Sequence, residues 1–308
     1  MAAPRISVIM NCLNCESYLR EAIDSVYAQT LGDWEIVFWD NASTDASAAI
    51  ARSYDHRLRY FRGDSTVPLG HARNLALAEA RGEFVAFLDC DDFWLPRKLE
   101  SQMSLLASKS EAGFVYGNFF LLYEDSGTRK VARPAKLPEG QIFEKFLLDY
   151  QAGLLTVMVR RSALEHLDTL FDENFNLVEE YDLFMRILYR TQAIYVSEPL
   201  AVCRIHEKNT STLERNGWMD EHTRVLKKLR SLDTSDRYHR AFDQLAIKLD
   251  LLSASIALWQ GQPGDARALV KAHWHYSPKS FALLLLSFVP ARIFLALRFF
   301  WRRGLLYR

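Results

Sequence analysis

The sharpest chemical signal in the sequence is the run Leu-Asp-Cys-Asp-Asp at positions 88–92. It follows an apolar stretch, 83–88, that predicts a strand buried on both faces. Strand alternation places Asp89 and Asp91 on the same side, where crowded carboxylates repel one another unless a cation or a partner neutralises them. Hard oxygen ligands suit Mg²⁺ or Mn²⁺, which bind through one or two carboxylates plus substrate phosphates. The alternative is a solvated acidic turn before the next helix.

A second pair of carboxylates, Glu179 and Glu180, stands where a helix is predicted to begin. A positioned carboxylate can act as a general base. The sequence alone favours a simpler explanation, because acidic side chains at a helix N-terminus are stabilised by the helix dipole. Asp182 and Arg186 likewise have the spacing of an ordinary surface ion pair.

The segment Cys12-Leu-Asn-Cys15 has the spacing of a redox pair or of half a zinc site. A zinc site needs further ligands, and Cys90 and Cys203 are expected to stand alone. We therefore favour neither function. Four scattered cysteines do not make a disulfide framework, which indicates a reducing, cytoplasmic environment.

Strands and helices alternate in the part of the chain that must position these residues. This order predicts parallel βαβ units covered on both faces, with ligands at the carboxyl ends of the strands. Strands are predicted at 6–10, 34–39, 58–61 and 83–88, and helices at 16–30, just after 40–45, and at 70–81. Polar loops follow three of these strands at 12–14, 40–45 and 89–92.

The remainder of the chain is predicted to support this sheet. We expect a helix over 95–106, a strand over 114–122, a polar mobile connection over 126–140, a helix from Glu179, and almost only helix from Glu214 onward. The predicted domains are an α/β domain at 1–212, which divides into halves at about 1–95 and about 96–212, and a helical region at 213–308.

The bulk composition restricts the partners. Lys and Arg together number 38, as do Asp and Glu, so no overall basic field favours nucleic acid. An apolar leader is absent from the first residues, and we expect a cytoplasmic protein.

The tail 278–308 is apolar and basic. Its apolar part could span a bilayer by length, but Arg292 lies at its middle and Pro290 would kink it. We therefore favour a helix lying in the interface of an anionic membrane. Packing on the catalytic domain or on the partner of a homodimer is the second choice, and a true span the third.

Several ordered sequence blocks resemble those of glycosyltransferase family 2, the inverting enzymes of GT-A fold. The blocks are Ser7 to Asn14, Tyr18-Leu19, Ala22 to Val26, Gln29-Thr30, Trp34 to Ile36, Asp40 to Asp45, Gly70 to Asn74, Ala80 to Glu83, Phe87 to Asp92, Glu179 to Leu183 and Arg204 to His206. The family commonly has Pro-Thr where this chain has Asn11-Cys12, and Glu-Asp where it has Glu179-Glu180.

The resemblance implies a role for each matching residue. Asp40 would bind the nucleobase, and Asn14, Arg73 and Cys12 would line the nucleotide. Asp89 would approach the ribose or metal, Asp91 would ligate Mn²⁺ or Mg²⁺, and His206 would reach the metal or the diphosphate. Glu180, or else Glu179, would be the general base. The implied reaction moves a sugar from a nucleotide-diphosphate donor, with UDP favoured, to a hydroxyl of a glycan or lipid-linked glycan. Cell-envelope polysaccharide synthesis is the implied setting. The resemblance makes 1–212 the catalytic domain, with its nucleotide-sugar half at about 1–95 and its acceptor half at about 96–212.

Two other functions compete with this one. A sugar-nucleotide nucleotidyltransferase would need a Gly-rich loop after the first strand, and 11–17 contains no glycine. A nucleotide- or carbohydrate-binding module without turnover would have no need of both the metal carboxylates and the base.

Overall fold

The computed structural model describes residues 3–133, 135–207 and 217–289. The chain divides into two compact units, Met1–Arg215 and Asn216–Arg308.

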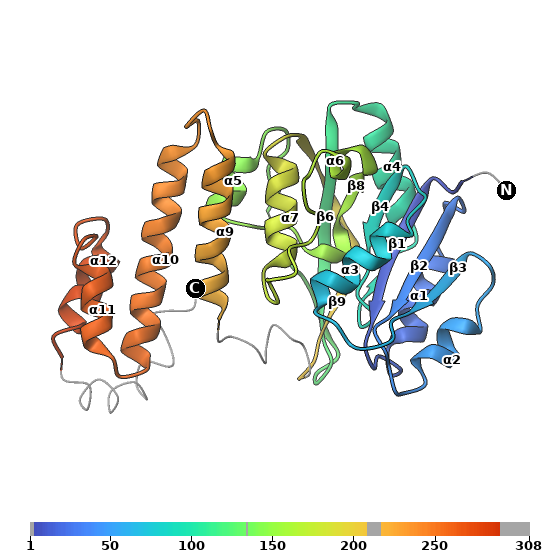
Figure 1. Ribbon diagram of the computed structural model, residues 1–308, viewed down its shortest axis with the longest axis horizontal. Helices are drawn as coiled ribbons and strands as arrows, with labels where there is room; N and C mark the ends of the chain where they lie inside the picture. The colour runs from blue at the N-terminus through green and yellow to red at the C-terminus, as the bar shows by residue number, and fades with distance from the viewer. Residues whose placement is uncertain (1–2, 134, 208–216, 290–308) are drawn as a thin grey trace. The chain divides into compact units, whose positions relative to one another are not determined.

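In the described part of the first unit, nine strands form one sheet (Figure 1). They are β1 (Ile6–Cys12), β2 (Trp34–Asp40), β3 (Leu58–Arg62), β4 (Phe84–Phe87), β5 (Phe93–Trp94), β6 (Ala112–Tyr123), β7 (Thr128–Val131), β8 (Met158–Arg160) and β9 (Gln192–Ile205). The spatial order is β3-β2-β1-β4-β8-β6-β9-β5, with β7 paired to β6. The pairs β1–β2, β1–β4, β2–β3 and β6–β9 are parallel. The predicted mostly parallel α/β sheet is confirmed.

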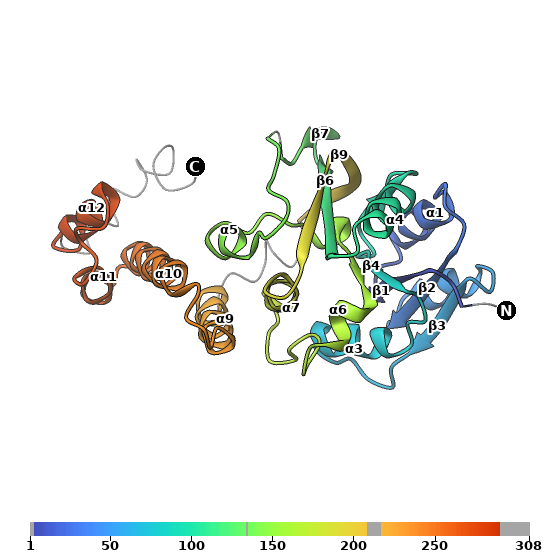
Figure 2. The same cartoon turned by 90° about the horizontal axis from the view of Figure 1, so that it is seen from above.

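Helices cover both faces of this sheet. They are α1 (Leu19–Tyr27), α2 (Ser47–Arg52), α3 (Leu69–Ala78), α4 (Lys98–Ser108), α5 (Phe143–Leu148), a 3₁₀ turn η1 (Leu154–Thr156), α6 (Arg161–Glu165) and α7 (Glu179–Leu188). In Figure 2, α1 and α4 lie on one face and α3, α6 and α7 on the other. Strand alternation explains this division, because successive side chains of a strand point to opposite faces of the sheet. Val8 of β1 packs in the core cluster with Ile23 of α1 on one face. Phe87 of β4 meets Phe184 of α7 on the other, at 5.8 Å between ring centroids.

The junction between β1 and β4 leaves no room for a side chain at Gly82. A Cβ there would lie 2.5 Å from the backbone nitrogen of Ser7, well inside contact distance. The Ser7 hydroxyl accepts the N–H of Gly82 at 2.8 Å and donates to Glu35 at 2.7 Å. Glycine therefore fixes β4 beside β1, and with it the loop that follows β4.

The structure corrects the expectation of an irregular connection over 126–140. Strand β7 lies in it and pairs with β6, with Thr128 opposite Tyr123. Gly127 has φ 63, which a tight turn requires and which other residues rarely adopt. This turn folds the chain back onto the end of β6.

The described residues of the second unit form the helices α9 (Trp218–Leu232), α10 (His239–Trp259), α11 (Pro263–Val270) and α12 (Pro278–Leu286). This agrees with the helical region predicted from the sequence. Ser277 and Ser280 form a capping box that sets the start of α12. Residues 290–308, which include most of the predicted apolar tail, lie outside the described residues. None of the helices in the described ranges combines the length and the apolar character needed to cross a bilayer.

Candidate active site

The three polar loops predicted to bind a ligand do gather at one edge of the sheet. Strand β1 pairs with both β2 and β4, with Cys12 opposite Asp40 and Ile9 opposite Phe87. Residues after these strands therefore emerge side by side. Asn14 binds the neighbouring loop, because its Oδ1 accepts the N–H of Thr44 at 2.8 Å.

Two non-glycine residues in these loops have left-handed backbone conformations, Asn14 with φ 56 and Ala42 with φ 64. Such conformations persist where the surrounding contacts impose them, and they concentrate at functional sites. The Asn14 N–H donates to Ser43 Oγ at 3.0 Å, one of the contacts that fixes the loop.

Asp40 is fully buried at the end of β2. Its carboxylate accepts the Tyr60 hydroxyl at 2.5 Å, the Arg62 guanidinium at 2.6 Å and the N–H of Ser43 at 2.7 Å. Burial raises the pKa of Asp40, but the hydrogen bonds from Tyr60 and Ser43 outweigh it, and the net effect is a lowered pKa. Asp40 is therefore an ionised acceptor shielded from solvent. Tyr60 and Arg62 were not identified from the sequence, since neither belongs to a recognisable motif.

Arg73 connects the loop after β4 to the start of α7. It is buried on α3, and its two terminal nitrogens contact Glu179 Oε1 at 2.5 Å and Asp89 Oδ1 at 3.0 Å. Burial lowers the pKa of Arg73, and the charges of Asp89 and Glu179 more than compensate. One guanidinium thus holds a predicted donor-site carboxylate and a predicted catalytic carboxylate together, although they lie 90 residues apart in the sequence.

His206, just beyond the end of β9, lies against Asp91. Its Nε2 is 3.1 Å from Asp91 Oδ2, and its ring stacks on Tyr18 at 5.1 Å between centroids. Burial, and next the charge of Asp89, raise the pKa of Asp91. Two nearby carboxylates with an imidazole are a donor set that fits Mn²⁺ or Mg²⁺. Asp89 is turned to Arg73, so the three predicted metal ligands do not form a closed cage.

Arg204 and Asp92 secure this acidic loop, and no role was predicted for either from the sequence. The N–H of Arg204 donates to Asp92 Oδ1 at 2.8 Å, and its Nε donates to the carbonyl of Asp91 at 3.1 Å. Its guanidinium also pairs with Glu21 of α1. Burial raises the pKa of Asp92 well above its usual range. The third acid of the Asp-x-Asp-Asp run was the available signal, because an acid that is buried there needs hydrogen-bond partners.

Glu179 and Glu180 differ in their surroundings although they are adjacent at the start of α7. Glu179 is buried in its ion pair with Arg73. Glu180 is half-buried, and burial raises its pKa to about 8, with Arg73 lowering it and Glu179 raising it to smaller extents. A carboxyl whose pKa lies near neutrality suits proton transfer at physiological pH.

The structure contradicts two expectations in this region. Cys90 does not stand alone, because its sulfur converges with those of Cys12 and Cys15. The pair Asp182 and Arg186 is not on the surface, since their contact of 2.7 Å joins side chains that are 0% and 5% exposed. Sequence spacing predicted the ion pair, whereas its burial depends on how α7 packs.

Comparison with known proteins decides the family. The profile described as "Glycosyl transferase family 2" matches residues 7–167, more than half of the chain. The chain belongs to glycosyl transferase family 2. Its reaction class is therefore glycosyl transfer. The family resemblance stated from the ordered sequence blocks is confirmed.

One curated relative of this family member is WfgD of Escherichia coli, named a UDP-Glc:alpha-D-GlcNAc-diphosphoundecaprenol beta-1,3-glucosyltransferase. It is 33% identical over 184 residues, which cover 59% of this chain and 69% of WfgD.

Two solved structures show the same fold. S. aureus TarS in complex with UDP-GlcNAc superimposes with a TM-score of 0.70 at 19% identity, covering 99% of this chain and 93% of TarS. The mannosyltransferase PcManGT from Pyrobaculum calidifontis, in complex with GDP-Man and Mn²⁺, has a TM-score of 0.56 at 20% identity, covering 99% of this chain and 89% of that one.

Proposed function

We propose that this chain transfers a sugar from a UDP-sugar, with a divalent cation, to a hydroxyl of a lipid-linked glycan during cell-envelope polysaccharide synthesis. The observation that carries the proposal is the double contact of Arg73 with Asp89 and Glu179. It brings the donor-site loop and the acids at the start of α7 to one place, as a direct displacement at a sugar carbon needs. The names of WfgD and of the TarS complex support UDP as the nucleotide.

In this proposal the loops after β1 and β2 bind the nucleotide. Asp40, ionised and fully buried, would accept an N–H of the base in exchange for one of its present hydrogen bonds from Tyr60, Arg62 or Ser43. Asn14 and Cys12 line the nucleotide site, where the hydrogen bond between Asn14 and Thr44 joins the two loops. Arg73 keeps Asp89 in position along the same site.

Asp91 and His206, with Asp89, are the proposed metal ligands, and Mn²⁺ or Mg²⁺ is the proposed ion. The Mn²⁺ in the PcManGT structure supports this choice. When bound, the cation would neutralise charge on the diphosphate leaving group. Arg204 holds the backbone of Asp91, which keeps the ligand oriented whether or not the ion is present.

Glu180 is the proposed general base. It would take the proton of the acceptor hydroxyl as the oxygen attacks the anomeric carbon and the diphosphate leaves from the opposite face, which inverts the configuration. Glu179 is the weaker candidate, because its ion pair with Arg73 stabilises the charged, proton-poor form. Glu179 then acts by holding Arg73.

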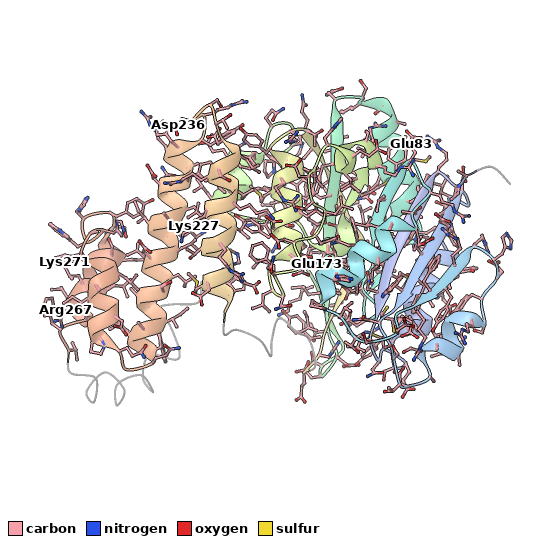
Figure 3. All side chains as sticks on the ribbon, viewed as in Figure 1. Glu83, Glu173, Lys227, Asp236, Arg267 and Lys271 are labelled. Carbon is pink, nitrogen blue, oxygen red and sulfur yellow. The ribbon has the colours of Figure 1, made fainter. Side chains whose placement is uncertain are left out.

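Contact with the membrane surface forms part of the proposal. Phe281, Leu285 and Phe288 repeat at i, i+4 and i+7 on α12 and just beyond, and they are 47%, 54% and 62% exposed. Lys279, two residues before Phe281, is exposed, and so is Lys271 of the same helical unit, which Figure 3 labels. An apolar helical face with basic neighbours suits an anionic membrane interface. We expect Phe281→Gln with Phe288→Gln to reduce sedimentation with anionic vesicles, and the matched change of Leu252 and Ile256 on α10 to leave it unchanged.

The transfer itself is tested with the purified full-length chain, a panel of UDP-sugars, Mn²⁺ and a diphosphate-lipid-linked N-acetylglucosamine acceptor. We expect one UDP-sugar to give UDP and an elongated acceptor, with inverted configuration by NMR of the product. Nucleotide binding without transfer to any acceptor would instead favour a binding module and refute the proposal.

A further inference from the structure

Three cysteine side chains converge beside the candidate donor site. Their sulfurs, on Cys12, Cys15 and Cys90, all lie within 4.8 Å of one another. Cys12 and Cys90 are 1% and 2% exposed, whereas Cys15 is partly exposed and gives the cluster a route to solvent. In the described part of the chain this is the one group in which three ligand atoms of His, Cys, Asp or Glu converge so closely.

The fold, not the local sequence, assembles the cluster. Strands β1 and β4 are parallel neighbours, so Cys12 at the end of β1 and Cys90 after β4 emerge at the same edge. The thiol of Cys90 donates to the carbonyl of Asn11 at 3.2 Å. On the other side, the N–H of Cys15 donates to Ser47 Oγ at 3.0 Å. These contacts fix the backbone around the sulfurs before any ligand arrives.

The distances fit a thiolate-bound metal. Zinc–sulfur bonds of about 2.3 Å in a tetrahedral site place the sulfurs about 3.8 Å apart. Reaching that separation from at most 4.8 Å requires each pair of sulfurs to approach by no more than about 1 Å. A disulfide would use two of the three thiols and leave the third without a bond. A metal ion uses all three, which is why we favour it.

We propose that Cys12, Cys15 and Cys90 form a binding site for one thiophilic divalent cation, represented by Zn²⁺. The thiol site would take a different ion from the carboxylates of Asp89 and Asp91, because soft thiolates select zinc or cadmium, whereas hard oxygens select magnesium or manganese. Three protons leave the thiols for solvent on binding, and water completes the tetrahedron. The bound ion would join the loop after β1 to the loop after β4.

The test is a titration of the reduced full-length chain with Cd²⁺, followed by the thiolate-to-cadmium charge-transfer band in the ultraviolet. We expect one Cd²⁺ per chain, displaceable by Zn²⁺. Cys15→Ser, a partly exposed position that should not disturb the core, should lose about a third of the band and bind more than about tenfold more weakly. Cys90→Ser should do the same, and Cys203→Ser, outside the cluster, should match the wild type.

Several outcomes would overturn the proposal. One is the absence of the band in the wild type, and another is an equal loss in Cys203→Ser and Cys15→Ser. A third is the loss of two thiols to a disulfide in air combined with no Cd²⁺ binding after reduction. A melting curve for each variant, measured without metal, separates a lost site from a lost fold. None of these measurements requires glycosyl transfer, so a failure here leaves the proposed function standing.

Discussion

Replacing Glu180 with glutamine should make the protein more stable at alkaline pH and nearly inactive. Burial raises the pKa of this carboxyl from 4.5 to about 8. Between these values the unfolded chain releases the proton while the folded chain keeps it, so folding becomes less favourable as the pH rises. Glutamine is neutral at every pH and has nearly the same shape.

The size of the effect follows from this difference in proton affinity. Each tenfold change in affinity corresponds to about 1.36 kcal/mol. Above pH 8 the free energy of unfolding of Glu180→Gln should therefore exceed that of the wild type by at most about 5 kcal/mol. Relaxation around a half-buried group should reduce this difference to a few kcal/mol. Below pH 4.5 both proteins carry a neutral side chain there and should be equally stable. Urea unfolding of both proteins at several pH values measures the gap.

The same substitution that raises stability should lower catalytic activity. Losing a general base lowers the rate by about 10² to 10⁴-fold, so kcat should fall by that factor while UDP binding is retained. The acid limb of the wild-type pH profile should lie well above pH 4.5, toward about 8, because Glu180 must be ionised to accept a proton. Glu144→Gln, an exposed change on α5, is the matched control and should alter neither property.

Wild-type turnover in Glu180→Gln would refute the assignment of Glu180 as the general base. A variant less stable than the wild type at pH 8 would mean that the folded protein stabilises the charged form, which would refute the proposed effect of burial.

Three other substitutions test the surrounding structure. Arg73→Ala leaves buried Glu179 without its ion pair and should lower the free energy of unfolding by about 3–5 kcal/mol in urea titrations, and no loss would contradict the proposed clamp. Gly82→Ala would place a Cβ 2.5 Å from the nitrogen of Ser7 and should cost about 1–3 kcal/mol in thermal melts, so an unchanged melting temperature would contradict that packing. His206→Gln should raise the Mn²⁺ concentration needed for half-maximal UDP binding, and an unchanged requirement would remove His206 from the metal site.

The features predicted correctly from the sequence are those that depend on local periodic patterns. The alternation of strand and helix periods gave the βαβ order and the three loops at the carboxyl edge, because period 2 and period 3.6 are visible in a single chain. The same patterns led to Asn14, Asp40 and Asp89, each of which lies at the end of a strand or within two residues of it.

The contacts that the sequence could not predict join distant segments. Arg73 meets Glu179, and Cys90 meets Cys12, only because α3, α7 and the strand ends pack as they do. Arg204 belonged to one of the sequence blocks that resemble the family. Its support of the acidic loop depends on the parallel pairing of β6 with β9, which brings the backbone of Arg204 to Asp92. Local periodicity carries no information on such pairings.

The most direct test of the central claim is calorimetric binding of UDP, GDP and dTDP to the full-length chain, with and without Mn²⁺, beside Asp91→Asn. We predict that UDP binds most tightly, that Mn²⁺ strengthens the binding, and that Asp91→Asn removes the Mn²⁺ effect. Equal binding of the three nucleotides, or Mn²⁺ dependence that survives Asp91→Asn, would contradict the assignment of this edge of the sheet as a metal-dependent UDP-sugar site.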